Sequence, residues 1–136
     1  MKLTVTIDGH ESYLVLKDRW SRRDLREWGE ATDTNLANVL TDDERAMPAD
    51  QRPLLSTEER QERMEARALT LLDSWCTEAY LVVTPDRAVH RPAELTPDDM
   101  LAMDASLVTF LFSAPWAAYR ERSRLGEPTV ERSSSR

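Results

Sequence analysis

The stretch 95–112 constrains the fold of this 136-residue chain more than any other, because it is the most apolar long segment. It opens with a helix-start signature: Thr96 suits the N-cap, Pro97 suits the first helical position, and Asp98-Asp99 places negative charge in the first turn. Leu95 is placed to pack on Met100 across that first turn as a hydrophobic staple. Apolar side chains then recur at three- and four-residue steps, which gathers them on one helical face. They are Met100, Met103, Leu107, Phe110 and Leu111. We expect one helix here, deep in the core, with the other elements packed on it.

The N-terminal residues predict a β-hairpin. Apolar and polar side chains alternate over residues 2–7, and Asp8-Gly9 is a strong signal for a two-residue type I′ turn. This turn sets a register in which Ile7 lies opposite His10, Val5 opposite Ser12 and Leu3 opposite Leu14. Leu14 and Leu16 then join the apolar face, and Tyr13 and Val15 lie on the other face.

Capping and periodicity predict further helices and a second hairpin. Ser21 with Asp24 resembles a capping box, with Trp20 and Leu25 as a staple pair, and Ser56 or Thr57 opens another helix. The packing stripe of that later helix comprises Met64, Ala68, Leu71, Leu72 and Trp75. Residues 80–84 and 88–91 read as paired strands, and a last helix is expected from Pro115 to a C-cap at Gly126.

The segment 32–56 is acidic and interrupted by prolines. Leu36, Val39 and Leu40 suit a short helical patch, and the run from 41 to 53 predicts a mobile loop. The predicted fold is therefore α+β and helix-dominated, a single domain over 1–126 with a disordered tail over 127–136. Whether the two hairpins join in one sheet stays open.

Charge and composition limit the partners and the compartment. The net charge is −7, so binding to nucleic acid would meet phosphate repulsion, and no apolar run approaches the roughly 20 residues of a membrane span. A secretory signal pattern is absent from the first residues, and the single Cys76 offers no intrachain disulfide. We expect a cytoplasmic protein with no nucleic-acid or membrane partner.

Catalytic and metal-binding patterns are weak. His10 and His90 have no second ligand at a familiar spacing, and Cys76 at the end of an apolar stripe predicts a buried, inert thiol. The cluster at 42–44 lacks the spacing of a calcium loop and suits a solvated loop, and Asp98-Asp99 suits a helix start. The three glycines, at 9, 29 and 126, leave no phosphate-binding loop. We expect no catalytic, cofactor or metal site, and no enzyme.

Two surfaces are candidates for binding a protein partner, namely the second face of the hairpin, with Tyr13 and Val15, and the final helix with its tryptophan. Four tryptophans, at 20, 28, 75 and 116, are many for this length, and core packing accounts for most of them. Tryptophan is also enriched at protein–protein hot spots, and Trp116 lies beside Pro115 on an amphipathic helix with basic residues after it. We assign Trp116, Tyr119 and Arg120 as the candidate protein-binding residues.

The layout of the chain resembles a family of phage proteins. The features are the opening hairpin, the helix of residues 20–28, an acidic middle, and an end that combines residues 95–104 with 110–126. This layout is similar to that of the small acidic tail assembly chaperones of long-tailed bacteriophages. The resemblance implies a non-enzymatic helper that binds tail-tube or tape-measure subunits during assembly in the host cytoplasm. No residue role carries over, because the layout contains no motif that maps onto single positions.

Other functions fit the same composition. A structural component of the phage particle, such as a head–tail connector or a capsid decoration protein, would share it. An acidic inhibitor of a host enzyme predicts a dense acidic face, but charges of both signs alternate over residues 58–63. A small enzyme would need a cleft with convergent polar groups.

Overall fold

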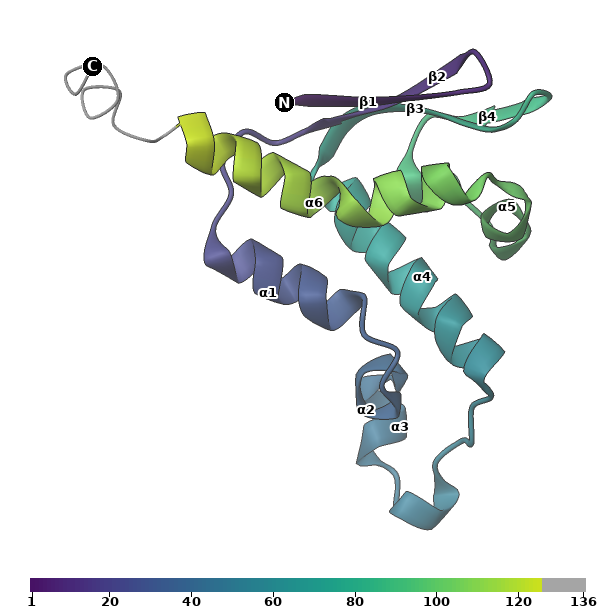
Figure 1. Cartoon of the computed structure of the whole chain (residues 1–136). Helices are drawn as coiled ribbons and strands as arrows, with labels where there is room; N and C mark the ends of the chain where they lie inside the picture. Colours follow the sequence, from purple (N-terminus) through teal and green to yellow (C-terminus); the bar gives the residue numbers. More distant parts are fainter. Residues whose placement is uncertain (126–136) are drawn as a thin grey trace.

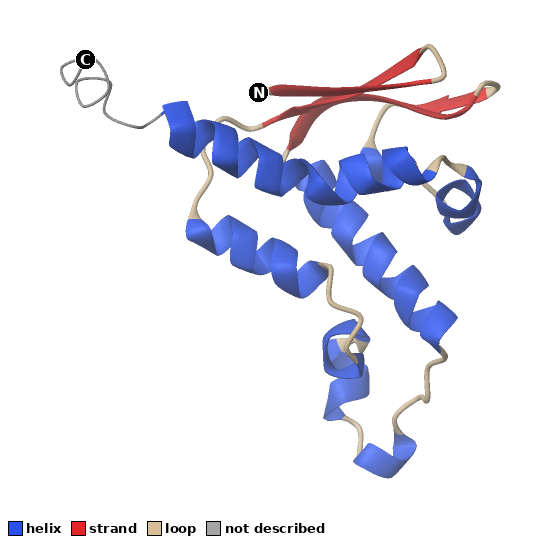
Figure 2. Ribbon diagram, in the orientation of Figure 1, coloured by secondary structure: helices blue, strands red, loops and turns tan. Residues whose placement is uncertain are grey.

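The computed structural model describes residues 1–125, with side chains up to residue 123, and it confirms the α+β fold. One antiparallel sheet has the strand order β1-β2-β3-β4. All the helices described lie on one side of this sheet, and no described helix covers its other face, called the open face below (Figures 1 and 2). The strands are β1 (Lys2–Ile7), β2 (His10–Leu16), β3 (Cys76–Thr84) and β4 (Arg87–Val89). The helices are α1 (Arg22–Ala31), α2 (Leu36–Val39), α3 (Asp42–Ala46), α4 (Thr57–Ser74), α5 (Pro97–Ala102) and α6 (Ala105–Leu125), with 3₁₀ turns η1 (Ala49–Gln51) and η2 (Pro92–Glu94).

The N-terminal hairpin has the predicted register. Ile7 lies opposite His10 and Leu3 opposite Leu14, and Asp8 and Gly9 have φ angles of 50° and 81°, as a type I′ turn requires. The second hairpin, β3–β4, pairs with the first through β2 and β3, so the two hairpins form one sheet.

The core lies between the sheet and the helices. Leu14, Leu16 and Leu81 on the sheet pack against Leu107 and Leu111 on α6, and all five are at most 1% exposed. Figure 1 shows α6 running beneath β1, with α1 beside it and α4 crossing behind. The predicted central role of residues 95–112 is thus correct for the α6 part of that stretch.

The prediction of one helix over residues 95–112 is wrong. The start at Thr96 is confirmed, with a full capping box, but α5 ends at Ala102 and α6 begins at Ala105. Asp104 causes the break, because its carboxylate accepts the N–H of Ser106 at 2.7 Å and so caps a new helix. The apolar periodicity continues across the break and therefore gave no sign of it.

The predicted helix start at Pro115 is also wrong. Pro115 lies inside α6, which runs unbroken from Ala105 to Leu125. A proline inside a helix removes one hydrogen bond, here that of the Leu111 carbonyl, and favours a bend. The predicted C-cap at 126 and the tail over 127–136 lie outside the described residues.

The strand β3 begins earlier than predicted, at Cys76 instead of Tyr80. A bulge hides this start in the sequence: Val15 pairs with Glu78 and Leu16 with Cys76, so Thr77 is an extra residue in β3. The extra residue breaks the two-residue alternation that marks a strand.

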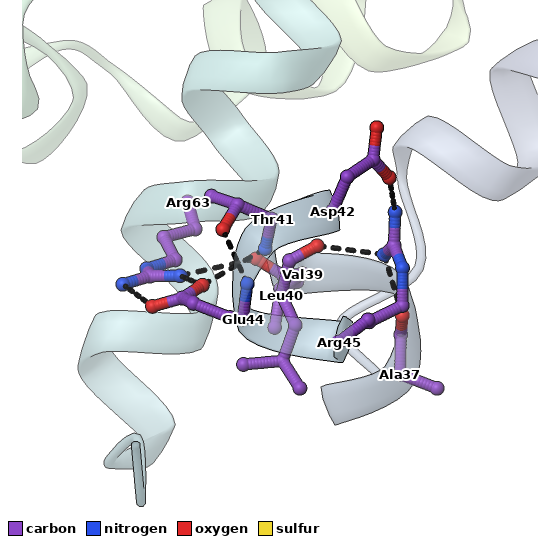
Figure 3. Close-up of polar contacts among 8 residues, drawn as sticks. All are labelled: Ala37, Val39, Leu40, Thr41, Asp42, Glu44, Arg45 and Arg63. Atoms are coloured by element: carbon purple, nitrogen blue, oxygen red, sulfur yellow. Dashed lines mark hydrogen bonds and ion pairs between the residues drawn. The ribbon is translucent and has the colours of Figure 1, made fainter. Parts of the chain in front are cut away.

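The prediction of a loop over 41–53 is wrong, because this run contains α3 and η1, whereas the short helical patch predicted at Leu36, Val39 and Leu40 is α2. Thr41 and Glu44 form a capping box that the sequence analysis missed. Figure 3 shows the Glu44 carboxylate between the Thr41 backbone and Arg63 of α4. Arg63 donates to the two carboxylate oxygens of Glu44 at 2.6 and 3.2 Å, and these hydrogen bonds connect α3 to α4. Within the same segment Arg45 pairs with Asp42.

Candidate protein-binding site

The four tryptophans divide into a buried group and one exposed side chain. Trp28 and Trp75 are 1% and 8% exposed, and their ring centroids lie 6.1 Å apart. Trp20 is half-buried, and its ring meets Trp75 edge-on at 5.1 Å. Trp116 is 44% exposed, so the residue chosen from the sequence as an anchor is the one tryptophan on the surface.

Trp116 lies in a shallow groove between α6 and α4. The groove has a volume of about 480 Å³. Its apolar wall is formed by Trp116, Phe112 and Val108 of α6 and by Met64 of α4, and polar side chains complete the lining. The polar members are Gln61, Thr109 and Ser113. An aromatic ring beside aliphatic side chains, with a polar rim, is the composition of a protein-binding surface.

The α6 segment that forms this groove is in contact with α1. The indole Nε1 of Trp28 donates to the carbonyl oxygen of Phe112 at 3.0 Å, and the two rings lie 5.9 Å apart. Phe112 also lines the groove, so this contact joins α1 to the groove wall. The buried tryptophan therefore fixes the wall on which the exposed tryptophan sits.

The three predicted binding residues do not all share this groove. Arg120 is exposed, but it borders a different hollow, together with Ala117 of α6 and residues 1–3 beside β1. Tyr119 is half-buried. The structure brings only Trp116 into the groove, and the sequence analysis missed Met64 and Phe112, because the packing of α4 on α6 is not encoded locally.

A second, larger hollow of about 1000 Å³ lies between α1, α2, α3 and α4. Arg67 and Arg45 line it, but both guanidinium groups are engaged by backbone carbonyls. Arg67 donates to the carbonyls of Glu30, Ala31 and Asp33 at 2.9–3.2 Å and so satisfies the end of α1. Because both guanidinium groups already bind backbone carbonyls of the fold, we do not choose this hollow as the candidate ligand site, although it is larger.

The open face of the sheet carries an aromatic row. The rings of Tyr13 and Tyr80 lie 6.3 Å apart, and His90 lies 5.6 Å from Tyr80. Lys2 Nζ lies 4.3 Å from the centre of the Tyr13 ring. The Tyr13 hydroxyl donates to Glu78 at 2.6 Å, and this bond raises the Tyr13 pKa above its ordinary value. The prediction that Tyr13 faces away from the core is confirmed.

Of the carboxylates singled out in the sequence, Asp42, Glu44 and Asp99 have arginine partners. Asp99 is buried, and Arg87 binds both of its oxygens, at 2.6 and 2.8 Å. Arg87, with the helix-start N–H of Thr96, holds the pKa of Asp99 well below its ordinary value. The Arg63 guanidinium likewise lowers the pKa of Glu44 to about 2. The helix-start role predicted for Asp98-Asp99 is confirmed.

The cysteine and the two histidines, which were considered as catalytic or metal-binding residues, do not form a common site. Cys76 is buried, its thiol donates to the Glu78 carbonyl at 3.0 Å, and burial raises its pKa, which fits an inert thiol. His10 lies beside the hairpin turn and His90 in the aromatic row. Among the side chains that the structure describes, no three His, Cys, Asp or Glu residues gather as metal ligands.

Comparisons with known proteins add no assignment: no family model, curated protein or solved structure matches this chain. None of the helices described over residues 1–125 combines the length and the apolar character needed to cross a membrane.

Proposed function

We propose that this chain is a non-enzymatic assembly chaperone of a long-tailed phage, which binds a tail-tube or tape-measure subunit before the subunit joins the particle. The observation that carries the proposal is the surface position of Trp116. It is 44% exposed on a held helix, beside the half-buried Phe112 and the buried Met64. An exposed tryptophan beside other apolar side chains is typical of a binding hot spot.

The lining of the groove suits an apolar segment as the bound element. The groove is shallow and its wall is apolar, so an amphipathic helix can place its apolar side chains against Trp116. The net charge of −7 keeps the chaperone soluble with an apolar groove on its surface.

Two substitutions at exposed apolar residues test the proposal. Tagged wild-type chain, Trp116→Ala and Leu101→Ala are each co-expressed with the tail-tube and tape-measure subunits of the genome that encodes the chain. Leu101 is 84% exposed on α5, outside the groove, so Leu101→Ala controls for non-specific binding through exposed apolar side chains.

The proposal predicts that one of the two subunits co-purifies with wild type and with Leu101→Ala, and is lost with Trp116→Ala. Equal recovery in all three samples would place binding elsewhere on the chain. Recovery of neither subunit, together with stable presence of the chain in purified particles, would favour a structural particle component instead. Capture of a host enzyme that the chain inhibits would favour a function as an acidic enzyme inhibitor.

A further inference from the structure

The two edges of the sheet differ in their protection. Exposed edge strands invite pairing with other chains, and proteins block them with short strands, charges, prolines or bulges. β4 has three residues, shifts register against β3 and is soon followed by Pro92. β1 has six residues, pairs with β2 in an unbroken register, and carries no charge from Leu3 to Ile7. Of the two edges, β1 is the one left unprotected.

The backbone of β1 presents hydrogen-bonding groups outward. Leu16 N–H donates to the Met1 carbonyl at 2.7 Å, and the Met1 ammonium donates to the Leu16 carbonyl at 2.8 Å. Alternate residues of an antiparallel strand bond to the same neighbour, so the backbone groups of Lys2, Thr4 and Thr6 point away from β2. β1 ends the strand order, and no other described segment bonds to these groups.

The apolar side chains of β1 are incompletely covered. Leu3, Val5 and Ile7 point to the helix side and pack on the core, but each stays only half-buried, whereas Leu14 on the next strand is fully buried. A further strand beside β1 would both satisfy the outward backbone groups and cover these side chains.

We propose that a second copy of this chain supplies that strand, with the two β1 strands antiparallel about a two-fold axis at Val5. Only the even-numbered residues of β1 have backbone N–H and C=O groups that point away from β2. To form hydrogen bonds across the axis, even-numbered residues of one copy must therefore lie opposite even-numbered residues of the other. The register centred on Val5 sets Thr4 opposite Thr6 of the copy, a favourable cross-strand pair. It also sets Lys2 opposite Asp8, the charged residues that flank this edge, so opposite charges meet at both ends.

Neighbouring registers lose this charge match. Centring the axis on Thr4 would set Lys2 opposite Thr6, and centring it on Thr6 would set Asp8 opposite Thr4. A two-fold at Val5 makes one continuous sheet from the two four-stranded sheets. Because α6 lies under β1, the axis also brings the two α6 helices near each other (Figure 1). A single strand pair with flanking helices gives a small interface, so we expect a dissociation constant on the order of micromolar.

The dimer is independent of the proposed chaperone function. The Trp116 groove is lined by residues of α4 and α6 and by none of β1, so the strand pairing uses no residue of the groove. Loss of the dimer and loss of subunit binding are therefore separate outcomes.

Sedimentation velocity over a concentration series tests the pairing. The wild-type chain is expected to shift from monomer to dimer mass with rising concentration. In Thr4→Lys/Thr6→Lys, lysines face each other across the axis, and the dimer is expected to be lost while circular dichroism stays unchanged. Thr34→Lys/Thr70→Lys adds the same charge at exposed sites off the sheet and should dimerise as wild type does. A wild-type chain that stays monomeric up to about 1 mM, or a dimer that survives the edge lysines, overturns the proposal.

Cysteine cross-linking in the full chain tests the register. In a Cys76→Ala background, Val5→Cys places two thiols opposite each other at the axis, within the Cα separation that a disulfide allows. Mild oxidation is expected to give a covalent dimer. Leu3→Cys alone should not cross-link, because residue 7 of the copy lies opposite it, and a mixture of Leu3→Cys with Ile7→Cys should. Cross-linking of Leu3→Cys with itself, or none by Val5→Cys, contradicts the register.

Discussion

Trp28 in α1 and Phe112 in α6, 84 residues apart, are joined by a 3.0 Å hydrogen bond from the indole Nε1 to the backbone carbonyl. The bond is made one residue after Leu111, whose carbonyl lacks a helical donor because of Pro115. A buried side chain of one helix thus supports the backbone of another beneath the Trp116 groove. The stability of that groove depends on a residue that does not line it.

The first prediction concerns this bond. Trp28→Phe keeps most of the ring packing but removes the N–H, so the Phe112 carbonyl loses its side-chain donor. We expect the free energy of unfolding in urea to fall by about 1–3 kcal/mol. Trp116→Phe, at an exposed site, should change it by less than about 0.5 kcal/mol. An equal change in the free energy of unfolding for the two variants would show that the Trp28–Phe112 hydrogen bond does not contribute to stability.

Two glycines should respond in opposite directions to the same substitution. Gly9 has φ +81° in the hairpin turn, which strains an alanine, so Gly9→Ala should destabilise the chain by about 1–2 kcal/mol. Gly29 lies inside α1 with open space where a Cβ would stand, so Gly29→Ala should stabilise it by up to about 1 kcal/mol. Thermal and urea unfolding of both variants measure the contrast, and a shared sign would contradict the assigned backbone conformations.

The Arg87–Asp99 pair predicts a pH-dependent stability. Because the pKa of Asp99 is lower in the folded chain than the ordinary value near 3.9, the carboxylate stabilises the fold above pH 4. That contribution is lost as pH falls from about 4 toward the lower folded pKa. Asp99→Asn should therefore be less stable than wild type at pH 7, by about 1–3 kcal/mol, and the gap should narrow toward pH 3. Asp98→Asn, at an exposed neighbour, is the control. A gap that stays constant with pH would argue against the charge on Asp99 as its cause.

The Glu44–Arg63 contact should control the local stability of α3. Glu44→Gln keeps the shape but removes the charge that Arg63 binds, so amide exchange over residues 41–47 should accelerate while that of α4 stays slow. Because the Glu44 pKa is about 2 in the fold, wild-type protection should persist at pH 4 and fall only as pH approaches 2. Hydrogen-exchange mass spectrometry measures both effects, and Asp43→Asn, an exposed neighbour, should leave protection unchanged.

The features that could be predicted from the sequence are those set by neighbouring residues. Asp8-Gly9 determined the register of the first hairpin, and Ser21, Ser56 and Thr96 marked helix starts, because turns and caps act over three or four residues. The break at Asp104 was missed, since a single carboxylate competed with an apolar pattern that continued past it.

The parts that were not predictable depend on long-range packing. Pro115 suits a helix start by local pattern, yet it lies inside α6, and the contact of Trp28 with the Phe112 carbonyl joins residues 84 positions apart. Trp116 could be chosen as a surface candidate from its place on an amphipathic helix. The groove around it needed Met64 of α4, whose approach to α6 no local pattern encodes.

The most direct test of the central claim is the affinity of the chain for its assembly partner, measured by titration calorimetry with purified tail-tube and tape-measure subunits. The proposal predicts binding by wild type to one of them, and a loss of about 2 kcal/mol or more, roughly 30-fold, in Trp116→Ala, with Leu101→Ala unchanged. Binding that is equally tight in all three chains would contradict the claim that the Trp116 groove is the binding site.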